Sequence, residues 1–203
     1  MKDKSLYISG WLLMVATGFG LGEAAVQSLA SVNSASAAPK EEAGRVVRVV
    51  DGDTYDVVVG SVRYRMRLLG VDAPEPDQPF GQQAGDSVAR LLGPQRLVEV
   101  TRHGVDLYGR TLATVRLPVA GRPAVALDSL LVVRGWAWSA PPPAPPLRER
   151  GVGWVASRAA QQTAAVTGRR GLWKCGAVGV LTPKQWRKFN YKNKRRYGVG
   201  CTW

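Results

Sequence analysis

The feature that most constrains the fold is a series of short strand-like segments separated by tight turn signals. Residues 45–50 and 54–59 are rich in β-branched residues and flank the turn sequence Asp51-Gly52-Asp53, a pattern typical of a β-hairpin. After Gly60, residues 62–69 alternate in part between apolar residues and arginines. This alternation predicts a third strand with one basic face.

The remaining segments predict how this sheet continues. Residues 82–92 have the spacing of a helix, which Gly93-Pro94 ends. Two more strands are expected at 97–101 and 111–117, and two more helices at 127–134 and 155–166. The expected fold class is α+β, mainly β. It is a small, partly open five-stranded barrel of the oligonucleotide-binding type with about three helices, and it covers residues 44–173.

Charge is distributed unevenly along the chain. The formal net charge is +13, and residues 150–203 hold twelve Lys and Arg with no Asp or Glu. Such a surface suits a polyanionic partner, either nucleic acid or an anionic membrane surface. A solvated basic tail that only aids solubility is the alternative interpretation.

The scarcity of histidine excludes several classes of hydrolase. The chain has one histidine, His103, at the expected end of a strand. Histidine-pair nucleases and zinc hydrolases with two or three histidine ligands need more imidazoles than this chain contains. Any hydrolytic chemistry must therefore depend on carboxylates, arginines and, where one is bound, a hard metal ion.

Residues 1–38 have the pattern of a targeting segment. Lys2 and Lys4 precede an uncharged apolar run from Leu6 to Leu21, and Ala35-Ser36-Ala37 offers a cleavage site. We expect a signal peptide and a secreted or extracytoplasmic protein. A retained membrane anchor is the alternative, because the cleavage site is far from the apolar run, although about sixteen apolar residues is short for a span.

Three clusters of charged residues lie at the ends of predicted strands. The first is Asp51-Gly52-Asp53-Thr54, the second runs from Arg67 to Glu75 with Pro74 stiffening its loop, and the third is Asp106-Leu107-Tyr108-Gly109-Arg110. Taken singly, the first is typical of a turn and the third of a charged hairpin.

Together, the three clusters contain the groups that phosphodiester hydrolysis requires. Asp53 and Asp72 offer oxygen ligands to a hard cation, and Glu75 offers a base to an attacking water. A five-coordinate phosphorus carries extra negative charge. Arg67 and Arg110 suit it because guanidinium groups stay protonated and can bind two oxygens at once.

The order of these motifs resembles that of the staphylococcal (micrococcal) nuclease, or thermonuclease-like, family. The resemblance extends from about Arg45 to Trp173 and rests on six motifs in order: Asp51-Gly52-Asp53-Thr54; Arg67 through Glu75; Phe80-Gly81-x-x-Ala84; Asp106-x-Tyr108-Gly109-Arg110; Leu131-Val132-x-x-Gly135-x-Ala137-Trp138; and Gly171-Leu172-Trp173. The chain also departs from the family pattern. Leu107 stands where relatives often have a basic residue, and Gln162 stands near the position at which relatives carry a glutamate in the last helix.

The resemblance implies calcium as the cofactor and a set of site residues. The implied calcium ligands are Asp53, Asp72 and the main-chain carbonyl of Ala73. The implied catalytic trio is Arg67, Glu75 and Arg110, and the implied nucleotide contact is Tyr108. Because a water attacks, no ribose hydroxyl is required. We therefore expect a secreted calcium-dependent nuclease that hydrolyses DNA and RNA, preferably single-stranded or breathing duplex, with low sequence specificity. We expect a monomer and infer no obligate protein partner.

Two other functions are compatible with parts of the sequence. One is a non-catalytic oligonucleotide-binding barrel protein of the cell envelope, and the other is an exported cationic protein that coats an anionic envelope. Family members that only bind tend to lose the catalytic trio, so the presence of Arg67, Glu75 and Arg110 argues against the first. The carboxylates Asp53, Asp72 and Glu75 argue against the second, since a polyanion binder gains nothing from acids at its site.

Residues 174–203 form a basic and aromatic C-terminal tail. Their mixture of Lys, Arg, Trp and Tyr predicts contacts with phosphates and bases that raise affinity for long nucleic acid. An aromatic patch that packs back on the barrel is the alternative. The export signal and the pair Cys175 and Cys201 also predict a disulfide. It would close a loop of about 26 residues and stabilise the tail by roughly 3 kcal/mol.

Overall fold

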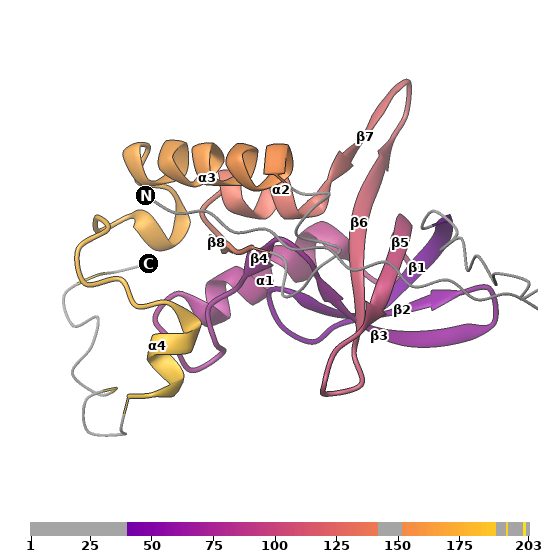
Figure 1. Ribbon diagram of the computed structural model, residues 1–203, viewed down its shortest axis with the longest axis horizontal. Helices are drawn as coiled ribbons and strands as arrows, with labels where there is room; N and C mark the ends of the chain where they lie inside the picture. The colour runs from indigo at the N-terminus through magenta and orange to yellow at the C-terminus, as the bar shows by residue number, and fades with distance from the viewer. Residues whose placement is uncertain (1–39, 142–151, 190–193, 195–200, 202–203) are drawn as a thin grey trace, which may run out of the picture. The chain divides into compact units, whose positions relative to one another are not determined.

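A computed structural model describes residues 40–141 and 152–189, together with residues 194 and 201 (Figure 1). Residues 1–38 lie outside this described part, so the signal peptide and the membrane anchor both stay predictions. Among the described residues, none of the helices has the length and apolar character needed to cross a membrane.

The described strands form a six-stranded sheet and a two-stranded sheet. They are β1 (Glu41–Val49), β2 (Thr54–Val59), β3 (Val62–Leu68), β4 (Val71–Asp72), β5 (Leu97–Val105), β6 (Thr111–Val119), β7 (Arg122–Ala126) and β8 (Trp138–Ser139). The larger sheet has the order β3-β2-β1-β5-β6-β7, and β4 pairs with β8. Its strand β3 also pairs in parallel with β6, with Met66 opposite Thr111 and Leu68 opposite Ala113. Five strands thereby close into a barrel, which confirms the predicted fold class.

Four α-helices accompany the barrel in the described residues. They are α1 (Gly81–Leu92), α2 (Leu127–Val133), α3 (Val152–Thr167) and α4 (Pro183–Arg187). Helix α3 packs on α2, where Arg158 Nε donates to Asp128 Oδ2 at 2.5 Å and both side chains are buried. Gln162 Oε1 accepts a hydrogen bond from the Ser139 amide at 2.7 Å. This hydrogen bond joins α3 to β8.

Two apolar clusters hold these elements together. The first fills the barrel beneath α1 and α2, and its largest buried members are Tyr55, Met66, Leu68, Leu92, Leu127 and Leu131. The second lies beside it and contains Phe80, Ala84, Trp138, Ala165, Leu172 and Trp173. Burial of a large apolar side chain contributes about 1.5–3 kcal/mol, so both clusters stabilise the fold strongly.

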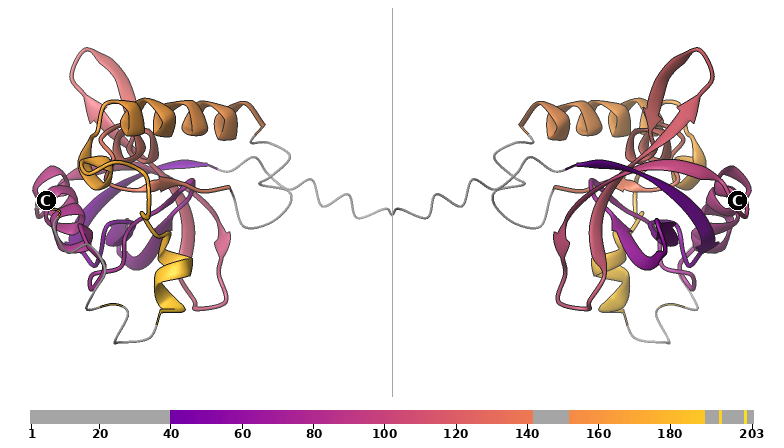
Figure 2. Two further views of the ribbon diagram at one scale, coloured as in Figure 1. Left: turned by 90° about the vertical axis from the view of Figure 1, so that its left-hand side faces the viewer. Right: turned by 90° about the vertical axis from the view of Figure 1, so that its right-hand side faces the viewer.

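Three features were not expected from the sequence: β7, the β4–β8 pair and α4. Strand β7 contains Pro123 and lies at an edge of the sheet, where its residues are exposed or half-buried. Proline is tolerated at an edge, and an edge strand needs no regular apolar alternation. In Figures 1 and 2 the β6–β7 hairpin projects away from α4. Strand β1 also begins at Glu41 rather than Arg45, because residues 41–45 pair with β5.

Asp56 on β2 is a buried carboxylate outside the predicted site. It accepts hydrogen bonds from Arg65 Nε at 2.9 Å and from Arg63 Nη2 at 2.6 Å. The hydrogen bond from Arg65 holds the pKa of Asp56 below its ordinary value, and burial opposes this effect. The ionised carboxylate is therefore favoured in the folded state over the unfolded one.

We expect Asp56→Asn to lower the free energy of unfolding by about 1–2 kcal/mol at pH 7. Because the folded pKa lies below the unfolded value, this stabilisation is present above about pH 4 and is lost as the pH falls through the folded pKa. Denaturant unfolding at pH 7 and at about pH 3 measures the difference, which should shrink in acid. Asp86→Asn, on the exposed face of α1, is the control. An equal loss for Asp56→Asn at both pH values would contradict the ion-pair explanation.

Candidate active site

The turn between β1 and β2 buries a carboxylate. Asp53 is only 6% exposed. Its amide donates to Asp51 Oδ1 at 3.0 Å, and its Oδ1 accepts from the Thr54 hydroxyl at 3.2 Å. Glycine is required at position 52, because a Cβ atom there would lie 2.6 Å from the Cβ of Ala73. The turn therefore packs directly against the loop that follows β4.

Arg67, near the end of β3, links this turn to the same loop. Its Nη1 atom donates to the main-chain carbonyls of Leu68 and Val71 at 2.7 and 3.0 Å. Its Nη2 atom lies 3.2 Å from Asp53 Oδ2 and 3.2 Å from Asp72 Oδ1. The two carboxylates therefore converge on one cationic nitrogen.

Burial affects the ionisation of both carboxyl groups. It raises the pKa of Asp53 to about 7, although Arg67 opposes the shift. Burial also raises the pKa of Asp72, and there Arg67 and Arg187 oppose it. Burial disfavours a charged carboxylate, so a nearby positive charge is needed to keep the two groups ionised.

The loop that carries Glu75 is shaped by main-chain contacts. The Glu75 amide donates to Gln78 Oε1 at 3.1 Å, and its carbonyl accepts from the Gln78 amide at 2.9 Å. Gly81 packs against the same carbonyl so closely that a Cβ atom would overlap it. The Glu75 carboxylate takes no part in these contacts and pairs instead with Arg187. Substitution of the carboxylate should therefore leave the loop intact.

Arg110, which precedes β6, is held by Asp106. Oδ1 of Asp106 accepts from the Arg110 amide at 2.9 Å, and Oδ2 accepts from Arg110 Nε at 2.8 Å. The Nη1 atom extends to 3.5 Å from Thr54 Oγ1, and the guanidinium lies 5.5 Å from the centre of the Tyr108 ring. Tyr108 is 84% exposed, so its ring can stack on a base. Leu107 is exposed as well and supplies no charge.

These side chains line one cavity of about 520 Å³. It contains every residue that the sequence assigns to catalysis, metal binding or nucleotide contact: Asp53, Arg67, Asp72, Ala73, Glu75, Tyr108 and Arg110. The structure thus brings together three clusters from separate turns and loops.

Three further charged residues line the cavity: Asp51, Arg65 and Arg187. Asp51 belongs to the first charged cluster of the sequence but was given no separate role, and sequence reasoning did not assign Arg65 or Arg187 to the site. The alternation of β3 places Arg65 on the same face as Arg67, so this pattern was a usable signal. Arg187 has no local signal, because 112 residues separate it from Glu75.

The cavity offers oxygen ligands to a hard cation. Among the described residues there is no group of three or more His, Cys, Asp or Glu that would form a metal site by itself. Asp53 and Asp72 nevertheless fit a cation, because they converge on the Nη2 atom of Arg67 and burial leaves them in need of positive charge. Ala73 lines the same cavity, and the family resemblance implies that its main-chain carbonyl is the third ligand. Water and phosphate oxygens would complete the roughly six to eight ligands that calcium takes.

Comparison with known proteins identifies the family. Residues 65–175 match the family described as Staphylococcal nuclease homologue, which is more than half of the 203 residues. The chain is 40% identical to Protein ParB of Escherichia coli over 119 residues, 57% of this chain and 67% of that protein. It is 42% identical to Micrococcal nuclease of Shigella flexneri over 100 residues, 47% of this chain and 57% of that protein. It is 40% identical to Thermonuclease of Staphylococcus hyicus over 84 residues, 38% of this chain and 50% of that protein.

The chain spans between half and about two thirds of these relatives. The matched residues nevertheless contain most of the cavity lining described above, from Arg65 to Arg110. The chain therefore belongs to the staphylococcal nuclease family.

Proposed function

We propose that the protein is a calcium-dependent nuclease that hydrolyses phosphodiester bonds of DNA and RNA with low sequence specificity. The observation that supports it is the meeting of Glu75, Arg67, Arg110 and two buried carboxylates in one cavity. Two of the similar proteins are named Micrococcal nuclease and Thermonuclease, which favours the same reaction class.

In this proposal Asp53, Asp72 and the carbonyl of Ala73 hold calcium. When bound, the ion supplies positive charge that polarises a phosphoryl oxygen. Its charge would also offset the electrostatic cost of burying the two carboxylates. In this structure the positive charge beside them is that of Arg67.

Glu75 acts as the general base. Its carboxylate accepts a proton from water while the water oxygen forms a bond to phosphorus and the bond from phosphorus to the leaving oxygen breaks. Solvent returns a proton to the leaving oxygen. Arg67 near the end of β3 and Arg110 just before β6 both line the cavity, so both guanidinium groups can bind the extra charge of the five-coordinate phosphorus.

The proposed substrates follow from the attacking group and from the residues that line the cavity. An attacking water makes no use of a ribose hydroxyl, so both DNA and RNA serve. Tyr108 offers a stacking surface that accepts any base. Because the exposed ring of Tyr108 can stack on a base that is free of its duplex partner, we propose single-stranded or breathing duplex substrates. We also propose that the protein acts as a monomer. On the charge pattern of residues 1–38, we also propose that the protein is exported.

The test is hydrolysis of denatured DNA and of RNA by purified protein with calcium or with a chelator. We expect cleavage of both with calcium and none with the chelator. Asp53→Ala should raise the calcium concentration for half-maximal activity by at least about tenfold, with partial recovery at high calcium. Binding of DNA without cleavage in calcium would instead support a non-catalytic binding barrel and would contradict the proposal.

A further inference from the structure

The C-terminal segment packs against the loop that carries Glu75. Trp186 of α4 is 1% exposed, and its Nε1 atom donates to Asp77 Oδ1 at 2.9 Å. Lys194 Nζ reaches the other oxygen of Asp77 at 2.7 Å. Trp186 therefore packs back on the domain, which was the alternative to the predicted stacking of the tail's aromatic residues on bases. The other aromatic and basic residues at 191–193 and 195–200 lie outside the described residues.

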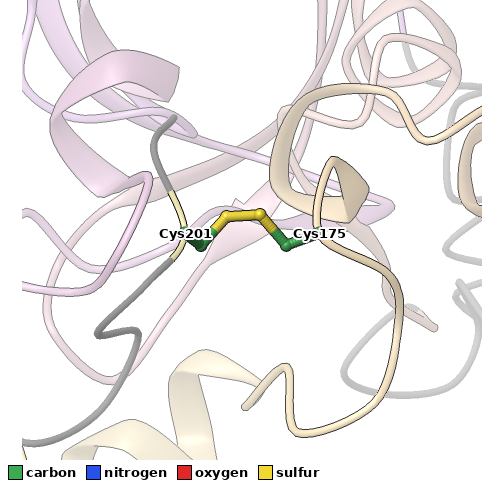
Figure 3. The surroundings of a disulfide bond; sticks show 2 residues. All are labelled: Cys175 and Cys201. Atoms are coloured by element: carbon green, nitrogen blue, oxygen red, sulfur yellow. A yellow bond between two sulfur atoms is a disulfide. The ribbon is translucent and has the colours of Figure 1, made fainter.

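Further contacts fix this segment at both ends. Gln78 Nε2 donates to the carbonyl of Leu181, and Thr182 forms a capping box with Gln185 at the start of α4. Cys175 and Cys201 form a disulfide in the structure, with Cα atoms 6.1 Å apart (Figure 3). Buried contacts and hydrogen bonds therefore attach the segment to the domain, and the disulfide closes a loop within the segment.

One consequence of this packing is that Arg187 enters the cavity rim. Its Nη1 atom pairs with the Glu75 carboxylate, and its side chain is 58% exposed. A guanidinium carries five N–H donors in a planar fork, so one carboxylate partner leaves donors available to solvent or to an anion.

The cavity contains more arginines than one phosphate needs. Arg67 and Arg110 suffice for the scissile phosphate, and Arg65 is engaged twice by the buried carboxylate of Asp56, at 2.9 and 3.3 Å. Arg187 is the remaining arginine of the lining, and it lies at the exposed rim. Nucleic acid presents a further phosphate at every nucleotide, a few ångströms along each strand.

We propose that Arg187 binds a phosphate next to the scissile one, so that the C-terminal segment forms part of the substrate-binding site. The inference rests on the proposed nuclease function. On binding, the negative charge of the neighbouring phosphate replaces or shares the pairing that Glu75 provides in the free protein. Glu75 is then less tightly held by Arg187 and is available to the attacking water.

The experiment compares Arg187→Ala and Arg187→Lys with wild type on two substrates. One is a single-stranded oligonucleotide of about ten nucleotides, and the other is a dinucleotide with one phosphodiester and no flanking phosphate. For Arg187→Ala, the loss in kcat/KM should be about tenfold larger on the oligonucleotide than on the dinucleotide and should appear mainly in KM. Arg187→Lys should recover part of the loss, because it keeps the charge but not the planar fork.

Binding provides a second measure that needs no turnover. With chelator present, Arg187→Ala should weaken oligonucleotide binding and reduce the slope of log Kd against log salt by about 0.7, the value for one phosphate contact on a single strand. Arg122→Ala, on the β6–β7 hairpin that projects away from α4, removes the same charge and should leave the slope and kcat/KM unchanged.

Three results would overturn the proposal. Equal losses on both substrates would make Arg187 a positioning residue for Glu75. Faster cleavage of both substrates would make it an inhibitory contact. An unchanged oligonucleotide affinity and salt slope would make it a stabilising ion pair. Failure of the proposed nuclease function is separate, since wild type would then cleave neither substrate while the binding measurement still reports on Arg187.

Discussion

Replacing Glu75 by glutamine is expected to lower kcat on single-stranded DNA by about 10²–10⁴-fold. Glutamine keeps the size of the side chain but cannot accept a proton from water. The loop should remain intact, because the main-chain N–H and C=O of Glu75 hold it through Gln78, not through the carboxylate. Asp53 and Asp72 are unchanged, so the calcium dependence and the affinity for DNA should stay close to those of wild type.

Turnover must be expressed per folded molecule, with thermal unfolding measured in parallel. Glu42→Gln is a matched control, because Glu42 also pairs with an arginine, Arg102, but lies outside the cavity lining. It should leave kcat unchanged. If Glu75 serves only to hold Arg187, then Glu75→Gln would lower the unfolding temperature and leave turnover near the wild-type value. That result would remove Glu75 from the mechanism.

Local sequence signals predicted the barrel well where turns are tight. The predicted strand at 54–59 matches β2, because Asp51-Gly52-Asp53 and Gly60 bound it on both sides. Apolar alternation predicted β3 only in part. Met66 and Leu68 are buried as expected, but Val62 on the same face is 49% exposed because it lies at the far end of the hairpin. The exposure of Val62 depends on where the barrel ends in three dimensions, and the spacing of apolar residues along the chain does not specify this.

The candidate site was predictable because its clusters are short and lie on turns. Each of the short sequences around Asp53, Glu75 and Arg110 contains both a turn signal and charged side chains. The same few residues therefore predict the local structure and the reactive groups that it carries. The C-terminal segment lacked such a signal. Its composition predicted a polyanion-binding tail, whereas the burial of Trp186 and the pairing of Arg187 depend on contacts more than 100 residues distant in sequence. Only the tertiary structure shows that this segment borders the cavity.

Replacing Arg110 by lysine is expected to lower kcat by about 10²–10³-fold, although the charge is conserved. Asp106 holds Arg110 through Nε at 2.8 Å, which leaves the Nη end to extend into the cavity beside Thr54. A lysine has one terminal nitrogen, so pairing with Asp106 would withdraw it from the phosphate. It also lacks the planar fork that binds two phosphate oxygens at once.

The measurement is kcat at saturating calcium and DNA, with unfolding temperature as the check on structure. Arg102→Lys is the matched control, because Arg102 is held by Glu42 through Nε at 2.7 Å and does not line the cavity. It should lose little activity, which would separate the loss at Arg110 from a general effect of replacing a paired arginine. Since the guanidinium is assigned to the transition state, the loss at Arg110 should appear in kcat and kcat/KM alike. A rise in KM with kcat unchanged would instead assign Arg110 to ground-state binding of the substrate.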